Sequence, residues 1–197
     1  MTIIHRFTLW ASLLLVALLT ACAHPITLGG DAGKLTGTGG PRIDRKVGLL
    51  ITDAQRQQQV TTPGGGGDKV TYQPYRDLET GLYVALSESF AGVSKISSVA
   101  DPKVAADGLN FIVTPSIATT SHSPSMLTWP PTVFTIELAA RFADPRDQLV
   151  TELKVKGEGR AEFEEFKADH SLSARRATDD ALKKLITAIS EAAAKLR

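Results

Sequence analysis

Histidines and serines are the first side chains to test for chemistry, because a hydrolase needs a nucleophile beside a base and a zinc site needs clustered ligands. Beyond the N-terminal segment the histidines are His24, His122 and His170. Serines flank His122 and follow His170, but no G-x-S-x-G elbow is present and no two histidines have metal-ligand spacing. We therefore expect no catalytic residue, no metal site and no cofactor, and we expect that the protein is not an enzyme.

An acidic cluster late in the chain is the other candidate, since paired carboxylates can cleave glycosidic bonds. Its members are Glu158, Glu162, Glu164 and Glu165. Strand alternation places the first three on a solvated face, which favours an ordinary charged surface. An envelope hydrolase is accordingly the weakest of the functional hypotheses below.

Cys22 is the only cysteine, and it directly follows Leu19-Thr20-Ala21. A short basic start with Arg6 and an apolar stretch over residues 7–19 precede this motif. The stretch is shorter than the ~20 residues that span a bilayer, and the order is that of a secretory signal. A leucine three residues before a cysteine is typical of a lipobox. We predict that residues 1–21 are a lipoprotein signal peptide and that Cys22 is lipidated.

The residue after Cys22 indicates which of the two membranes would hold the lipidated protein. Ala23 stands where an aspartate would mark inner-membrane retention in enteric-type lipoproteins. We therefore expect a protein held by its acyl chains at the periplasmic face of the outer membrane, rather than at the inner membrane. The mature chain would carry 21 basic and 21 acidic residues, because the signal contains only Arg6. This balance argues against a nucleic-acid partner.

Residues 22–45 are rich in glycine and poor in apolar side chains, which predicts a flexible tether of roughly 25–30 Å. Residues 46–197 are predicted to form the single folded domain. Apolar residues on both faces predict a central strand over 46–53. The glutamines and glycines of residues 54–70 predict a mobile loop.

The middle of the chain alternates between helix and strand signals. Leucines at three- to four-residue spacing predict a helix over 77–92, followed by a short strand over 95–99. Strand, helix and strand in succession indicate a right-handed crossover between parallel neighbours. A further strand is predicted over 109–119, at a sheet edge or with a bulge because Pro115 cannot donate to a ladder.

The clearest hairpin joins strands predicted over 133–143 and 149–161. Placing inward residues opposite one another pairs Phe142 with Leu149 and Glu137 with Lys154. The last helix is predicted over 171–196. These elements predict an α+β fold, with a mixed sheet of about five strands in the order β-α-β-β-β-β-α and two helices packed on one face.

Several short motifs carry a resemblance to a known family. They are the lipobox, the Val47-Gly48-Leu49 strand ending at Asp53, the Arg76-Asp77-Leu78 helix start, Gly157-Glu158-Gly159 and the alanine-rich last helix. On these the chain resembles the YajG-like family of outer-membrane lipoproteins. Similar small α+β lipoproteins serve as non-enzymatic parts of envelope machines. The resemblance implies a binding or scaffolding role and no catalytic residue.

Two surfaces are candidates for such a role. The apolar residues Met126, Leu127 and Trp129 lie in a proline-rich loop over 121–131, and they are typical of interface anchors unless they fold back as a lid on the sheet. They favour a scaffold of an envelope transport or assembly complex, with a protein partner or a homo-oligomer. The alternative is a glycan- or lipid-binding module that uses the outer sheet face. Its ligand candidates are Arg141, Lys154, Lys156 and Arg160.

Overall fold

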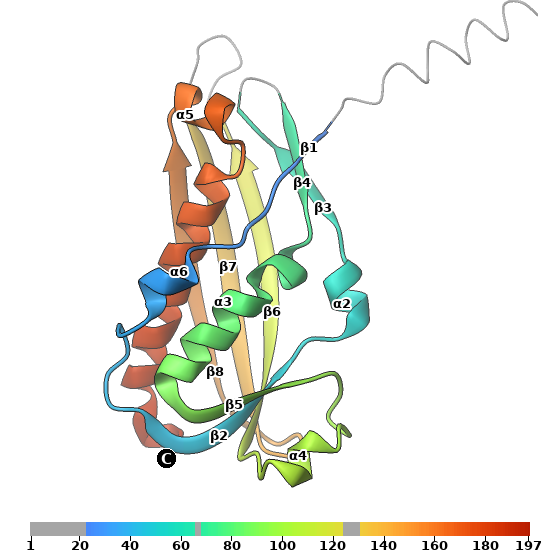
Figure 1. Cartoon of the computed structure of the whole chain (residues 1–197), viewed down its shortest axis with the longest axis vertical. Coiled ribbons are helices and arrows are strands. Elements are labelled where there is room, and N and C mark those ends of the chain that lie inside the picture. Colours follow the sequence, from blue (N-terminus) through green and yellow to red (C-terminus); the bar gives the residue numbers. More distant parts are fainter. Residues whose placement is uncertain (1–22, 66–67, 124–130) are drawn as a thin grey trace, which may run out of the picture.

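The structure is a computed structural model that describes residues 23–65, 68–123 and 131–197. It has the predicted α+β class and forms a single domain (Figure 1). The main sheet has the strand order β5-β2-β6-β7-β8. Its strands are β2 (Ile43–Leu50), β5 (Phe90–Ile96), β6 (Phe111–His122), β7 (Thr132–Ala143) and β8 (Leu149–Ala161).

The parallel part of this sheet confirms that the strands on either side of the predicted helix are parallel neighbours. β2 pairs in parallel with both β5 and β6, which gives it the interior position expected of a doubly apolar strand. Helix α3 (Pro74–Ser89) joins β2 to β5 and buries Leu78, Leu82 and Leu86. It begins at Pro74, whose fixed φ suits a first helical position. The chain enters β5 at Phe90, inside the segment predicted to be helical and five residues before the predicted start of the strand.

Pro115 was expected at a sheet edge, but β6 lies between β2 and β7. The register with β7 runs through Pro115, which lies opposite Ala140, without a bulge. β2 pairs with β6 only as far as Val113, and beyond that point the amide of Ile117 donates to the Tyr75 hydroxyl at 3.3 Å. Residues two apart on a strand point their amides the same way. Pro115 therefore sits where β6 has no strand to donate to.

The hairpin β7–β8 is confirmed, but its predicted register is wrong by two residues. Glu137 lies opposite Lys156, and Phe142 lies opposite Thr151. A bulge between Phe142 and Ala143 shifts the ladder next to the turn. Leu149, expected to face inward, is consequently 62 % exposed.

The last long helix, α6 (Leu172–Glu191), lies against β7 and β8 beside α3, so both long helices cover one face of the sheet (Figure 1). A short 3₁₀ turn, η2 (Ala193–Lys195), continues it, and a short helix, α5 (Phe163–Ala168), precedes it. Gly157 and Gly159 of β8 face α6, where the helix backbone leaves no room for a Cβ. Another short helix, α4 (Lys103–Ala106), lies between β5 and β6.

A second sheet occupies part of the segment predicted to be a mobile loop. Helix α2 (Asp53–Gln57) follows β2, and strands β3 (Val60–Pro63) and β4 (Lys69–Tyr72) pair antiparallel. Val70 and Tyr72 are buried, and the Tyr72 hydroxyl bonds to that of Thr119 at 2.8 Å. The loop prediction was wrong because the two strands are only four residues each, and the glycines and glutamines around them dominate the composition of the segment.

The predicted flexible tether is also wrong over residues 23–45. Strand β1 (Ala23–Pro25) pairs in parallel with β4, and a 3₁₀ turn, η1 (Ala32–Leu35), lies against α3 and α6. Leu28 and Leu35 are buried in the main core. The amide of Leu28 donates to Asp77 Oδ2 at 3.2 Å. No helix within the described residues is long and apolar enough to cross a membrane.

Candidate functional site

Four of the predicted site residues, Cys22, Met126, Leu127 and Trp129, lie outside the described residues. The described residues next to them, Ala23 and Ser121, can nevertheless be placed in the fold. Ala23 pairs with Lys69, and Lys69 pairs with Pro63. The Ser121 hydroxyl contacts the Pro63 carbonyl and lies 2.7 Å from Thr62 Oγ1. The residue after Cys22 and the base of the apolar loop therefore lie at the same end of the molecule (Figure 1).

The four basic ligand candidates lie on or beside the outer face of β7 and β8, and each is ion-paired. Arg141 pairs with Asp147 at 2.6 Å, Lys154 with Glu152 at 2.9 Å, Lys156 with Glu158 at 2.7 Å and Arg160 with Glu162 at 2.9 Å. Hydrogen bonds to these glutamates raise the pKa values of Lys154 and Lys156. Each of the four cations is matched by an anion, which does not favour a polyanionic ligand.

The same face carries a hollow of about 430 Å³ on the side of the sheet away from α3 and α6. Its lining includes Ser116, Ala118, Glu137, Ala139, Lys154 and Lys156. Small side chains from β6 and β7 form its floor, while longer charged side chains from β7 and β8 stand around it. The hollow could hold an uncharged polar ligand.

Two members of the acidic cluster, Glu158 and Glu165, have lowered pKa values, whereas the acid of a glycosidase pair needs a raised one. Hydrogen bonds from the Arg176 guanidinium lower the pKa of Glu165 to about 2. A hydrogen bond from Lys156 likewise lowers the pKa of Glu158. Both carboxylates are ionised partners of neighbouring cations.

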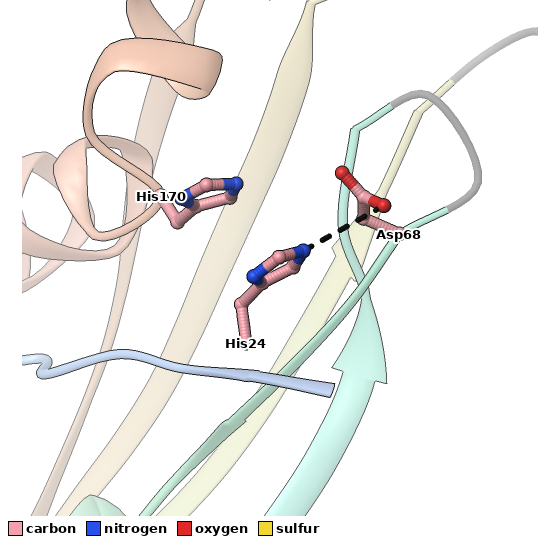
Figure 2. A group of neighbouring side chains, drawn as sticks. All are labelled: His24, Asp68 and His170. Atoms are coloured by element: carbon pink, nitrogen blue, oxygen red, sulfur yellow. Dashed lines mark ion pairs between the residues drawn. The ribbon is translucent and has the colours of Figure 1, made fainter. Parts of the chain in front are cut away.

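A cluster that spacing alone did not indicate lies at the end of the molecule that contains β1. His24 comes from β1, Asp68 from the turn before β4, and His170 from the connection between α5 and α6. One ligand atom from each lies within 4.8 Å of the others. Figure 2 shows the two imidazoles one above the other, with Asp68 beyond their nitrogen-bearing edges. The segments are far apart in the chain, and His24 had been assigned to a tether, so no sequence pattern marked them.

The contacts within this cluster are close. The His24 and His170 rings stack at 4.2 Å between centroids, and Phe166 meets His170 edge-on at 4.9 Å. His24 Nε2 lies 3.7 Å from Asp68 Oδ1, and Lys167 Nζ lies 3.6 Å from Asp68 Oδ2. Burial, and then the neighbouring His24, lower the pKa of His170. Its Nε2 is buried and has no hydrogen-bond partner among the described residues.

No protein-family model matches the chain, and no curated protein matches it. Among solved structures, a minor lipoprotein from Acinetobacter baumannii is similar at 12 % identity and a TM-score of 0.48, over 77 % of this chain and 94 % of that one. A candidate neuraminyllactose-binding hemagglutinin homologue from Helicobacter pylori is 14 % identical, with a TM-score of 0.45 over 80 % and 87 % of the two chains. A DUF330 protein from Xanthomonas campestris is 10 % identical, with a TM-score of 0.45 over 88 % and 95 %.

Proposed function

We propose that the chain is a non-catalytic, lipid-anchored protein at the periplasmic face of the outer membrane, where it scaffolds an envelope transport or assembly complex. The observation that carries this proposal is the shared location of Ala23 and Ser121. Two strand spacings, about 9–10 Å, separate the strand that follows the predicted lipid site from the strand that contacts the loop's base. The lipid anchor and the apolar loop would then leave the domain from the same end.

The anchor would also hold the domain close. Consecutive Cα atoms are about 3.8 Å apart, and Cys22 directly precedes strand β1. With no flexible tether over residues 23–45, the three-stranded sheet would lie next to the lipid headgroups. A loop that leaves this end meets either a partner in the membrane plane or a second copy of the chain. Met126, Leu127 and Trp129 are its contact candidates.

Cys22→Ser tests the anchor. Without the thiol no diacylglycerol can be attached, so the folded protein should leave the membrane pellet almost completely and appear in the soluble periplasmic fraction. Fractionation with immunoblotting measures this, and the melting temperature of the released protein reports whether it is folded. Continued sedimentation of the folded variant with membranes would contradict anchoring through Cys22 alone.

Trp129→Ala tests the scaffold. The variant should keep its melting temperature within about 2 °C, because an exposed contact adds little to folding, and should lose most of its crosslinked partner or dimer after mild crosslinking in membranes. Leu149→Ala is the matched control, since Leu149 is an exposed apolar residue at the start of β8, at the other end of the hairpin from the loop. A large fall in melting temperature with crosslinking unchanged would instead make the loop a lid.

The hollow on the outer sheet face favours a second candidate, a glycan-binding module. Its small-residue floor and mixed-charge rim fit an uncharged sugar better than an anionic lipid. In the crosslinking experiment this candidate gains support if the Trp129→Ala variant and its control both keep every envelope contact. The loop would then have no part in binding.

A further inference from the structure

Three potential metal ligands converge where the N-terminal strand meets the body of the protein. His24, Asp68 and His170 reach this point from three separate segments, and their ligand atoms lie within 4.8 Å of one another. The convergence is tertiary, which distinguishes it from the acidic cluster, whose members are neighbours in the sequence from the end of β8 into α5. Two imidazoles with one carboxylate are a donor set that zinc and several first-row transition metals accept.

We propose that His24, Asp68 and His170 bind one divalent transition-metal ion, for which Zn²⁺ is a suitable probe. The orphaned nitrogen supports this assignment independently of the spacing. His170 Nε2 is buried and has no hydrogen-bond partner among the described residues, and a buried polar atom normally has one. A bound ion would give it that partner.

Binding requires the ligand atoms to move closer together and the two imidazole rings to turn. Ligand atoms about 2.0–2.1 Å from a tetrahedral ion lie roughly 3.3 Å from one another, which is closer than the 4.8 Å limit of the cluster. The stacked imidazoles would have to tilt toward each other at their nitrogen edges, because lone pairs in nearly parallel planes do not meet at one point. Asp68 Oδ1 already faces His24 Nε2 at 3.7 Å, while Oδ2 faces Lys167. Three protein ligands leave one coordination position for water or a partner's side chain.

The ion would fasten the strand that follows the predicted lipid site. β1 pairs with β4 over only three residue pairs, so the ladder alone holds it weakly. A shared ion would join β1 to the turn before β4 and to the connection between α5 and α6. This inference does not depend on the scaffolding role, because it concerns the protein alone.

The experiment is a Zn²⁺ titration of the detergent-solubilised full chain after chelator treatment, followed by calorimetry and thermal melting. We expect one Zn²⁺ per chain and a rise in melting temperature of about 5–10 °C when free Zn²⁺ exceeds the dissociation constant a hundredfold. His24→Phe and His170→Phe keep an aromatic ring for stacking and remove the donor nitrogen. Each should weaken binding more than about tenfold.

His122→Phe is the matched control, because His122 is exposed at the end of β6 and outside the cluster. It should bind Zn²⁺ like the unaltered chain. Asp68→Asn, which leaves both rings in place, decides the matter if the phenylalanine variants do not fold, and it should also weaken binding. The absence of a one-equivalent transition overturns the site, as does equal affinity of the His122→Phe chain and the cluster variants.

Discussion

Gly159→Ala is expected to destabilise the protein by about 3 kcal/mol or more, which would lower its melting temperature by about 6–12 °C. A Cβ at this position would lie 2.0 Å from the Ser173 carbonyl oxygen and 2.3 Å from the Ala177 amide nitrogen. Both atoms belong to the backbone of α6, so no side chain can rotate away. The helix would have to move off β8 and open the core between them.

Gly40→Ala is the control for this substitution, because a Cβ there meets only the Ser190 hydroxyl at 3.8 Å, an ordinary contact. We expect a change within about 0.5 kcal/mol, measured by denaturant and thermal unfolding. Gly157→Ala should behave like Gly159→Ala, since its Cβ would lie 2.3 Å from the Ala177 carbonyl oxygen. Equal stability of the Gly159→Ala and Gly40→Ala chains would show that α6 is not packed on β8 as described.

These glycines also explain one part of the resemblance noted in the sequence. Gly157-Glu158-Gly159 alternates a residue under α6 with one on the outer face, where Glu158 pairs with Lys156. The small residues of α6, among them Ala177 and Ala181, are the other half of the same close approach. The two glycines of this segment are therefore explained by the packing of α6 on the sheet.

Long periodic segments were predictable from the sequence because one period repeats over many residues. The hairpin β7–β8 and the buried stripe of α6, with Leu182, Leu185 and Ile189, follow from such repeats. The register of the hairpin could not be predicted in this way, because the bulge at Phe142 is a local backbone irregularity that the alternation of apolar and polar residues does not encode. Pro115 shows the same limit, since its place depends on where β2 ends.

Short segments were predicted wrongly where tertiary contacts outweigh composition. Residues 23–45 and 54–70 read as coil from their glycines and polar side chains, yet both contain buried residues such as Leu28 and Val70. Two or three apolar side chains, once buried in the core cluster, suffice to hold such a segment against the rest of the fold. The His24 cluster depends on that docking, so it was beyond prediction from spacing. The Cys22 motif is local to the sequence, and its lipidation stays a prediction.

Leu28→Ala is the sharpest test of the docked N-terminal segment, and we expect it to destabilise the protein by about 2–5 kcal/mol. Leu28 is fully buried in the core cluster that contains Leu78, Leu82 and Leu182. Its amide donates to Asp77 Oδ2, so the backbone is held in place while the side chain is removed, and the cavity cannot close easily. The expected fall in melting temperature is about 5–15 °C.

The same substitution at an exposed position supplies the control. Leu149→Ala should change stability by less than about 0.5 kcal/mol, because Leu149 is 62 % exposed beside the β7–β8 turn. Trypsin gives a second readout, since undocking should expose the bond after Lys34, whose ammonium lies 3.4 Å from Asp179. A flexible tether predicts equal stability and equally fast cleavage for both variants. Docking predicts that only Leu28→Ala loses stability and is cleaved faster.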